Sequence, residues 1–270
     1  FEKWVLDLNG GSIDPLTVER INAAVNGTAY STPILGLLSE IDAAEDVLSA
    51  AELEFWDENG YVIVRNAISR DDAKASETVV WEHLGMSPDD PASWYGKPIG
   101  KGIMMELYHH ETLAKNRRSP RIHKAFAQLW KDSDLWATID RTSFNPPETG
   151  GYSFQGPNLH WDMSLAEPHY FGTQGILYLC DTAAEQGAFT CVPGFNRELG
   201  SWLDSLPDRS AARQIDLSSL AVPIAANAGD LIIWHQFLPH GASPNRGRFP
   251  RIAQYINMFP TTRRENMEWA

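Results

Sequence analysis

The chain has 270 residues, 43% of them hydrophobic, and carries 22 Lys and Arg against 35 Asp and Glu, a formal net charge of −13. A chain of this length and apolar content can bury a large core, whereas its negative charge repels phosphate backbones and anionic membranes. We therefore expect one large globular domain, or a domain with an appended helical layer, with neither nucleic acid nor membrane as a partner.

No apolar run approaches the roughly 20 residues that cross a bilayer, and the opening residues FEKWVLDLNGG do not resemble a signal peptide. Cys180 and Cys191 are the only cysteines, too few for a disulfide framework. These features are typical of a cytoplasmic protein with reduced thiols. They leave open whether the protein is a monomer or a homodimer.

Helix punctuation organises the first part of the chain. A helix is expected from Pro15 to about Gly27, because proline suits the first helical turn and glycine the residue after the last turn. In SAAELEFWDENG, Ser49 and Glu52 form a capping box and Gly60 ends the helix. The other elements expected here are a strand over YVIVRNAI and helices over RDDAKASETVVWEHLG and PRIHKAFAQLWK.

From Leu135 onward the chain changes to short apolar or alternating runs between turn residues, which predict strands. These runs are LWATIDRTSF, QGILYLCD, AFTCVPG, AVPIAA, DLIIWHQ and RIAQYINMF. Strands that follow helices favour an α+β fold whose binding half is an antiparallel barrel or jelly roll. We expect a single domain over residues 1–270, with a mainly helical layer over 1–100, a jelly-roll core over 101–260 and a tail over 261–270.

The segment GPNLHWDMS places His160 and Asp162 two positions apart. In a strand, residues i and i+2 project from the same face, so these side chains reach one point while Trp161 packs on the opposite side. An imidazole and a carboxylate are both metal ligands. The tripeptide alone also fits a histidine paired with a surface aspartate, so its meaning depends on a further ligand.

That ligand is expected in GDLIIWHQFLPHGASPN, where His240 follows an apolar strand. With His160 and Asp162 it completes a set of two histidines and one carboxylate. Such a set occupies one face of a metal, leaves three positions open and suits non-haem Fe(II). His235 lies inside the apolar strand beside Trp234 and is better explained as a core histidine.

Arg251 stands at the start of RIAQYINMF, eleven residues after His240. A guanidinium inside an apolar barrel requires an anionic partner, which it can bind through two parallel hydrogen bonds. The distal carboxylate of 2-oxoglutarate is such a partner, and an ordinary surface arginine is the alternative. Arg246 and Arg248 fit the surface alternative.

The ordered set of His160-x-Asp162, EQGAFTCVPGF, GDLIIWHQFLPHGASPN and Arg251 resembles the phytanoyl-CoA dioxygenase family of Fe(II)/2-oxoglutarate oxygenases. The likeness extends to ELEFWDENGYVIVRNAIS and covers most of residues 50–260. It implies a double-stranded β-helix, a jelly-roll or cupin-like barrel with N-terminal and flanking helices. It also implies that His160, Asp162 and His240 bind Fe2+ and that Arg251 binds 2-oxoglutarate.

The chain departs from the family pattern near the cosubstrate. Many members have Ser or Thr two residues after the distal histidine, where this chain has Ala242. Ser243, one step later, is then the candidate contact to the cosubstrate. Many also read PGSH where this chain reads PGFN. These differences put the outer contacts to 2-oxoglutarate in doubt. Because Asp162 is present, the resemblance disfavours the halogenating variants, which need that coordination position for chloride.

Alternation along QGILYLC predicts that Gln174 and Tyr178 share a face, and either side chain is a candidate hydrogen-bond partner of the cosubstrate. A core aromatic is the alternative for Tyr178. Arg141 in IDRTSFNPP is expected near the barrel mouth, where it either holds an acidic substrate group or forms a salt bridge on the rim.

The resemblance implies a dioxygenase that uses O2 and 2-oxoglutarate to hydroxylate, or otherwise oxidise, an unactivated C–H bond of a small organic metabolite, with release of succinate and CO2. A cupin-like metalloenzyme that uses no 2-oxoglutarate is one alternative. A noncatalytic jelly-roll module that binds a ligand is the other.

Overall fold

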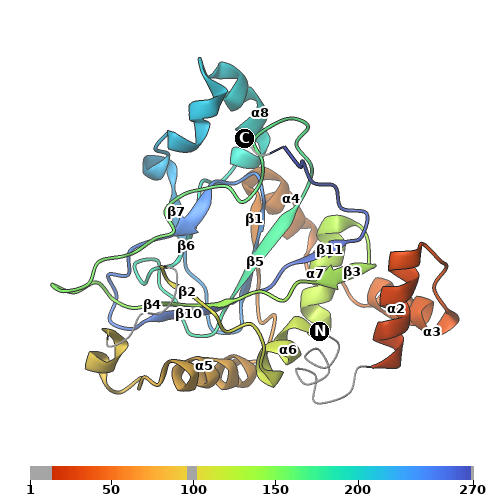
Figure 1. The fold of residues 1–270 in the computed structure, drawn as a ribbon, viewed down its shortest axis with the longest axis horizontal. Helices are drawn as coiled ribbons and strands as arrows, with labels where there is room; N and C mark the ends of the chain where they lie inside the picture. Colours follow the sequence, from red (N-terminus) through yellow and green to blue (C-terminus); the bar gives the residue numbers. More distant parts are fainter. Residues whose placement is uncertain (1–13, 96–101, 269–270) are drawn as a thin grey trace.

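The computed structural model describes residues 14–95 and 102–268 (Figure 1). Its helices are α2 (Pro15–Asn26), α3 (Thr32–Ala43), α4 (Ala50–Asn59), α5 (Arg70–Leu84), α6 (Glu111–Arg117), α7 (Pro120–Trp130) and α8 (Phe195–Ser205), with short 3-10 turns over Pro91–Tyr95, Arg209–Gln214 and Ser218–Leu220. Its strands are β1 (Tyr61–Val64), β2 (Met104–Met105), β3 (Leu135–Ala137), β4 (Thr142–Asn145), β5 (Thr173–Tyr178), β6 (Phe189–Cys191), β7 (Val222–Ile224), β8 (Leu231–His235), β9 (His240–Ala242), β10 (Arg251–Tyr255) and β11 (Met258–Pro260).

The strands form a six-stranded sheet in the order β1-β8-β5-β10-β4-β2, a three-stranded sheet β7-β6-β9 and a pair β11-β3. All of these strand pairs are antiparallel. The predicted α+β composition with antiparallel sheets is thus confirmed. β1 falls inside the expected helical layer yet pairs with β8, so that layer also supplies an edge strand. The boundary expected near residue 100 lies outside the described residues.

Side-chain caps define the predicted helices. Ser49 Oγ accepts a hydrogen bond from the Glu52 N–H, and the Glu52 carboxylate accepts one from the Ser49 N–H, which confirms the capping box of α4. The Ser69 side chain caps α5 by accepting a hydrogen bond from the Asp72 N–H. Gly60 and Gly85 end these two helices in the left-handed conformation that glycine adopts without strain.

The helices α3, α6 and α8 were not expected from the sequence, and the starts of two of them explain why. Ser31 precedes α3 but makes no capping hydrogen bond. α6 is capped by the ring of His110, and α8 follows Gly194 without a side-chain cap. His110 and Gly194 are outside the Ser, Thr, Asp and Asn group that marks a helix start in a sequence, whereas Ser31 followed by Pro33 is such a signal and was overlooked.

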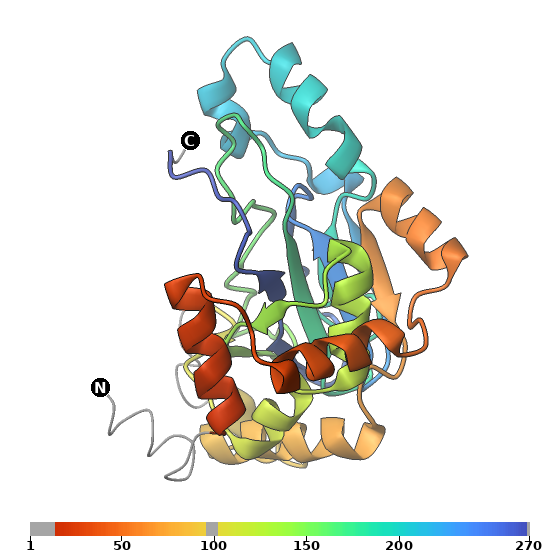
Figure 2. The ribbon, with the colours of Figure 1, turned by 90° about the vertical axis from the view of Figure 1, so that its right-hand side faces the viewer.

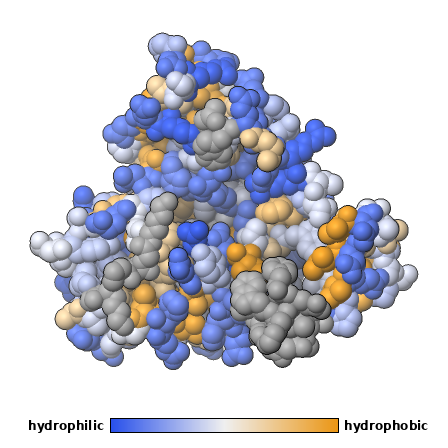
Figure 3. Space-filling view, in the orientation of Figure 1, coloured by the Kyte–Doolittle hydropathy of each residue, from blue (hydrophilic) through white to orange (hydrophobic). Residues whose placement is uncertain are grey.

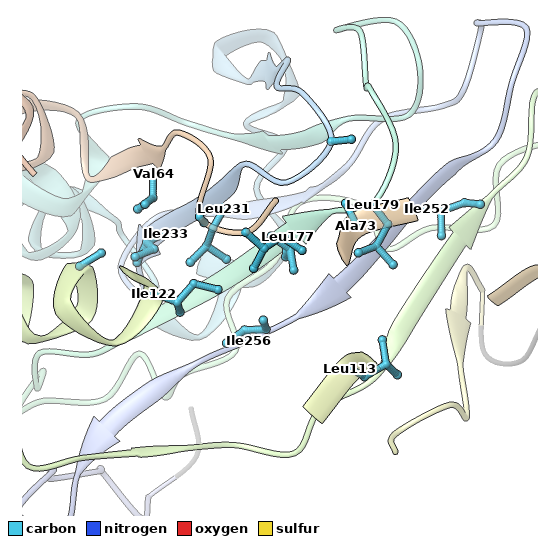
Figure 4. Packing of buried hydrophobic residues seen from close by; sticks show 14 of the residues in the cluster. Val64, Ala73, Leu113, Ile122, Leu177, Leu179, Leu231, Ile233, Ile252 and Ile256 are labelled. Atoms are coloured by element: carbon cyan, nitrogen blue, oxygen red, sulfur yellow. The ribbon is translucent and has the colours of Figure 1, made fainter. Parts of the chain in front are cut away.

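One face of the six-stranded sheet packs against α5, α6 and α7. Figure 4 shows Ala73, Leu113 and Ile122 from these helices beside Leu177 and Ile252 from the sheet. Figures 1 and 2 place α5 at one end of the molecule and α8 at the other. The large sheet is therefore covered by helices on its outer face.

The inner face of this sheet points toward the three-stranded sheet. Because side chains alternate along a strand, Ile176 and Tyr178 of β5 point inward, while Leu177 joins the outer cluster. Ala253 of β10 and Trp234 of β8 also belong to the inner cluster. The space between the two sheets is therefore the interior in which a site can form.

The helices α2 and α3 stand at the side of the sheets and keep part of their apolar surface exposed, seen as orange in Figure 3. The exposed apolar residues on these helices are Val18, Ile21, Val25, Leu35 and Leu37. Among the described helices, none is long and apolar enough to cross a bilayer.

Candidate active site

His160 and His240 lie side by side because their backbones pair. The His160 N–H donates to the His240 carbonyl over 2.9 Å, and the His240 N–H donates to the His160 carbonyl over 3.0 Å. His240 begins β9, whereas His160 forms an isolated bridge and Asp162 lies in a bend. The regular strand expected around His160 was therefore wrong. Prolines and glycines between residues 146 and 172 interrupt the ladder, since proline has no N–H to donate.

Both imidazole rings are held by the carbonyl group two residues earlier. His160 Nδ1 lies 2.7 Å from Asn158 O, and His240 Nδ1 lies 3.1 Å from Leu238 O. Because a carbonyl oxygen only accepts, each Nδ1 carries a proton, so Nε2 is the nitrogen that offers a lone pair to a metal when the ring is neutral. A metal-binding histidine has this arrangement, with its other nitrogen donating to a fixed acceptor.

Gly241 lets the segment that carries His160 approach β9. A Cβ added at Gly241 would lie 2.7 Å from Asn158 O, the carbonyl that orients His160. Any side chain at this position would push that carbonyl away. Glycine beside His240 is therefore part of what brings the two imidazoles together.

Asp162 completes the cluster. Its Oδ1 lies 3.4 Å from His160 Nε2 and its Oδ2 lies 3.3 Å from His240 Nε2. One ligand atom from each of the three residues lies within 4.8 Å of the other two. At these distances each Nε2 either donates a proton to the carboxylate or offers its lone pair to a cation that all three residues bind. The set of two neutral imidazoles and one carboxylate fits a non-haem Fe(II) ion.

The electrostatics agree with a charged aspartate. Burial by itself raises the pKa of the Asp162 carboxyl, but hydrogen bonds with His160, His240 and Gln174 outweigh burial and hold this pKa well below its usual range. Burial also lowers the pKa of His160, whereas its hydrogen bonds with Asp162 and the Asn158 carbonyl raise it, and the net pKa is raised. Asp162 is therefore an anion at neutral pH, as a metal ligand must be.

Gln174 contacts the aspartate. Its Nε2 donates to Asp162 Oδ2 over 2.8 Å, and its Oε1 accepts from Trp234 Nε1 over 3.0 Å. An indole N–H only donates, so the amide orientation is fixed by Trp234. The sequence predicted a contact between Gln174 and the cosubstrate, and the structure places this side chain in the cavity with both of its groups already engaged.

Arg251 is fully buried, with 0% of its surface exposed. Its Nε donates to the Gly187 carbonyl over 3.0 Å and its Nη1 donates to Ser143 Oγ over 2.5 Å. Its Nη2 is buried and has no hydrogen-bond partner among the described residues. A buried donor left unpaired on a charged group is costly. The residue is thus not the surface arginine of the alternative interpretation, and its free Nη2 fits a carboxylate such as that of 2-oxoglutarate.

The other two predicted cosubstrate contacts are placed differently. Tyr178 is buried, and its hydroxyl donates to the Ile224 carbonyl over 3.0 Å and accepts from the Phe189 N–H over 2.8 Å. Burial raises the pKa of this phenol. Tyr178 does not line the cavity, and its placement is that of the core aromatic. Ser243 is half-buried, and its Oγ lies 3.4 Å from the Ala188 carbonyl.

A cavity of about 550 Å³ opens onto the three ligands. Apolar and aromatic side chains form much of its wall: Met104, Pro157, Phe189, Trp234, Tyr255 and Phe259. Polar and charged side chains complete the wall: Asp140, Arg141, Gln155, Gln174, Gln236, Asn257 and Arg263. A cavity of this size and mixed character is typical of a small-molecule site.

Several residues of the cavity wall and of the surroundings of Arg251 were missed in the sequence. Ser143 and Asn145, which contact or pair with Arg251, lie in a strand that offers only polar residues beside one phenylalanine. Arg263 was assigned to the tail. His235, in contrast, packs between Phe171 and Phe237 as the core interpretation predicted, and burial lowers its pKa to about 4.

The phytanoyl-CoA dioxygenase family model matches residues 56–253, more than half of the chain. The chain belongs to the phytanoyl-CoA dioxygenase family. It is therefore an enzyme, an Fe(II)/2-oxoglutarate-dependent oxygenase that requires iron and 2-oxoglutarate, and not a noncatalytic module. The family resemblance found in the sequence is confirmed.

Two curated proteins align over most of the chain. A Dictyostelium discoideum protein named "Putative phytanoyl-CoA dioxygenase" is 23% identical over 266 residues, which covers 77% of this chain and 75% of that protein. The "Ava biosynthesis cluster protein O" of Aspergillus versicolor is 20% identical over 230 residues, which covers 74% of each.

Solved structures share the fold. EctD from S. alaskensis, crystallised with 2-oxoglutarate and 5-hydroxyectoine, superposes with a TM-score of 0.59 at 16% identity, covering 83% of this chain and 80% of that chain. The epimerase SnoN, in complex with Fe3+, alpha ketoglutarate and nogalamycin RO, superposes with a TM-score of 0.58 at 16% identity, covering 78% and 82%. The predicted double-stranded β-helix is thus confirmed.

Proposed function

We propose that this enzyme oxidises an unactivated C–H bond of a small organic metabolite, with hydroxylation as the direct outcome and succinate and CO2 as coproducts. The observation that carries the proposal is the convergence of His160, Asp162 and His240, with ligand atoms within 4.8 Å, on the wall of a cavity of about 550 Å³. The relatives support a small organic substrate, because SnoN was crystallised with nogalamycin RO and EctD with 5-hydroxyectoine.

In this proposal, each residue has a defined task. His160, Asp162 and His240 would hold Fe2+ on the wall of the cavity, as a set of two histidines and one carboxylate suits. Arg251 binds the distal carboxylate of 2-oxoglutarate through its free Nη2, and Ser143 holds the guanidinium in place. Iron with 2-oxoglutarate and O2 supplies the oxidising power for the C–H bond.

The cavity wall supports the same chemistry. Phe189, Trp234 and Tyr255 give an apolar lining next to the ligands, which excludes water and keeps the reacting carbon close. The shared fold does not fix the outcome of the oxidation, since the epimerase SnoN and the carbocyclase SnoK both have it. Hydroxylation is proposed because it needs no further group beyond those described.

An anaerobic titration tests the proposal. Addition of Fe(II) and 2-oxoglutarate is expected to give the visible charge-transfer band of a chelated oxoacid. The Asp162→Ala variant should lose this band while remaining folded by circular dichroism. If the wild-type protein binds iron but gives no band with 2-oxoglutarate, the cupin-like alternative that uses no oxoacid replaces the proposal. A screen for succinate release over metabolite classes then identifies the substrate.

We also propose that the protein works in the cytoplasm as a single domain over residues 1–270, as a monomer or a homodimer. The two free thiols, Cys180 and Cys191, support a reducing compartment. Sedimentation equilibrium measures the oligomeric state, and fractionation of cells that produce the protein measures its location. A tetramer, or a protein recovered outside the cytoplasm, contradicts these assignments.

A further inference from the structure

Two arginines, Arg141 and Arg263, line the cavity that holds the metal ligands, whereas the fully buried Arg251 is not among its lining residues. Arg141 precedes β4 and Arg263 follows β11, so they come from distant parts of the chain to one space. The chain as a whole has a net charge of −13, which makes two cations on one cavity wall notable. Their placement indicates an anionic ligand in addition to 2-oxoglutarate.

Arg141 is fixed at its backbone while its guanidinium lacks a carboxylate partner. Its N–H donates to Asp140 Oδ1 over 2.7 Å, and its carbonyl accepts from the Tyr255 N–H over 2.9 Å. The Arg141 guanidinium carbon lies 5.9 Å from the Tyr108 ring centroid. Within residues 14–95 and 102–268, no carboxylate forms an ion pair with Arg141. The salt-bridged rim residue expected as one alternative is thus not observed there.

Arg263 presents an unpaired donor. Its guanidinium carbon lies 4.6 Å from the centroid of the Phe259 ring, and its Nη2 lies 2.7 Å from Glu265 Oε1. The Glu265 side chain is 57% exposed, so solvent screens this pair. The Arg263 Nε is buried and has no hydrogen-bond partner within residues 14–95 and 102–268. A buried N–H on a cation is best satisfied by an anionic acceptor.

The iron site has no net negative charge that Arg141 and Arg263 would neutralise. The charges of Fe2+, Asp162, Arg251 and the doubly charged 2-oxoglutarate cancel. Asp140 is the carboxylate that remains on the wall, and it accepts from the backbone of Arg141. With the iron site neutral, Arg141 and Arg263 leave the cavity with an excess of positive charge.

The arginines also lie apart from the proposed cosubstrate carboxylate. Arg251 pairs with Asn145, and Arg141 precedes Asn145 by four residues, about 13 Å at 3.3 Å per residue. Tyr255 pairs with Ile176 and lies next to Arg141, and Gln174, which contacts Asp162, lies two residues further along β5 on the side away from Arg251. Because Arg141 lies about 13 Å from Arg251 along the sheet, we assign Arg141 to an anion other than the carboxylate that Arg251 binds.

We propose that Arg141 and Arg263 bind a carboxylate of the substrate, so that the substrates are small organic acids with an apolar body. This inference rests on the proposed function. The two guanidiniums hold the acid group, while Met104, Phe189 and Phe259 contact the apolar body. The carbon to be oxidised then lies between the acid group and the iron ligands, at a distance from its carboxylate.

Matched probes test this site. We would titrate the anaerobic protein, loaded with Fe(II) and 2-oxoglutarate, with 3-phenylpropanoate and with its neutral carboxamide, and follow binding by calorimetry. The acid is expected to bind at least about tenfold more tightly than the amide, as one charge-assisted hydrogen bond requires. In Arg141→Gln and Arg263→Gln, the affinity for the acid should fall about tenfold, while that for the amide stays unchanged. The exposed Arg248 provides the control, Arg248→Gln, with no change expected.

Two outcomes overturn the proposal. Equal binding of acid and amide, or binding of neither, excludes a carboxylate site. If the arginine variants lose affinity for 2-oxoglutarate, measured from the charge-transfer band, the arginines serve the cosubstrate instead. The two failures are distinguishable, because a wild-type protein without the band contradicts the proposed function, whereas a wild-type band without acid preference contradicts only this inference. Thermal melts of each variant confirm that the fold is retained.

Discussion

Gln174 donates a hydrogen bond from Nε2 to Asp162 Oδ2 over 2.8 Å while the Trp234 indole fixes its amide from the other side. The carboxylate is thereby oriented by a residue on β5, a central strand of the large sheet, although Asp162 itself lies in a bend. A rigid strand thus supplies the geometry that an irregular segment does not supply alone.

Replacement of Gln174 should weaken iron binding. In Gln174→Leu the Asp162 carboxylate loses its donor and Trp234 Nε1 loses its acceptor. The affinity for Fe(II) is expected to fall about 10- to 100-fold, the usual effect of removing a group that orients a metal ligand. Anaerobic calorimetry measures this affinity. Gln155→Leu is the control, because Gln155 lines the cavity and, in the part of the chain that the structure describes, its side chain bonds only to the Ser153 carbonyl. Equal losses in both variants would contradict the orienting role.

Removal of a metal ligand should lower the Fe(II) affinity more than removal of Gln174, which only orients a ligand. In His160→Ala and in Asp162→Ala, the Fe(II) affinity is expected to fall by more than the roughly 10- to 100-fold predicted for Gln174→Leu. His235→Ala should leave Fe(II) affinity close to that of the wild type, since His235 packs among aromatic rings. A large loss in His235→Ala with full binding in His160→Ala would mean that the ligands are assigned wrongly.

The substitution Arg251→Lys should separate cosubstrate binding from iron binding. Lysine keeps the charge but has no planar fork. The affinity for 2-oxoglutarate is expected to fall about 10- to 100-fold, corresponding to a charged hydrogen bond of roughly 1.5–3 kcal/mol. Fe(II) affinity should be unchanged. The charge-transfer band, titrated with 2-oxoglutarate, measures the first quantity, and Arg246→Lys on the surface is the control. An unchanged band midpoint in Arg251→Lys would remove Arg251 from the cosubstrate site.

The sequence was sufficient to predict which residues form the site, but not how the backbone brings them together. The order of His160, Asp162, His240 and Arg251 along the chain was sufficient to propose the ligands, because their residue types match one metal chemistry. The expected strand around His160 was wrong, since the pairing of His160 with His240 is a single bridge formed by distant segments. Spacing alone does not encode that bridge.

The contacts around these residues depend on tertiary structure. Alternation correctly placed Gln174 and Tyr178 on the inner face of β5, yet it could not tell that Gln174 reaches Asp162 while the Tyr178 hydroxyl bonds to Ile224. Arg263 was not predicted, because it approaches the cavity through a turn after β11 and no periodic pattern marks that path. Long-range packing, not local preference, decides such contacts.

Replacement of Trp161 should lower both the stability of the fold and the affinity for Fe(II). Its ring packs against Phe195 and Trp202 of α8, with centroids 5.8 Å away in each case, and its Nε1 donates to the Phe237 carbonyl over 2.8 Å. Trp161→Ala is expected to cost about 3–5 kcal/mol and to lower Tm by about 10 °C. Because His160 and Asp162 flank this anchor, Fe(II) affinity should fall too. Trp161→Phe, which keeps the ring contact, should cost less on both measurements.

A buried histidine should make the fold sensitive to acid. Burial among Trp56, Phe171 and Phe237 lowers the pKa of His235 from 6.5 to about 4. The unfolded chain takes up this proton as the pH falls below about 6.5, whereas the folded chain does so only near pH 4. The stabilisation that comes from burying neutral His235 is therefore fully present above pH 6.5. Acidification lowers the free energy of unfolding by roughly 3 kcal/mol in total through this residue.

The variant His235→Phe removes this titration and should flatten the dependence of stability on pH. Urea unfolding of the metal-free protein at pH 7.5 and at pH 4.5 gives the loss of unfolding free energy for each variant. The wild type is expected to lose about 2–3 kcal/mol more than His235→Phe between these values. His83→Gln, at an exposed position of α5, should behave like the wild type. Parallel losses in the wild type and His235→Phe would show that His235 does not carry the acid sensitivity, since other titrating groups are common to both proteins.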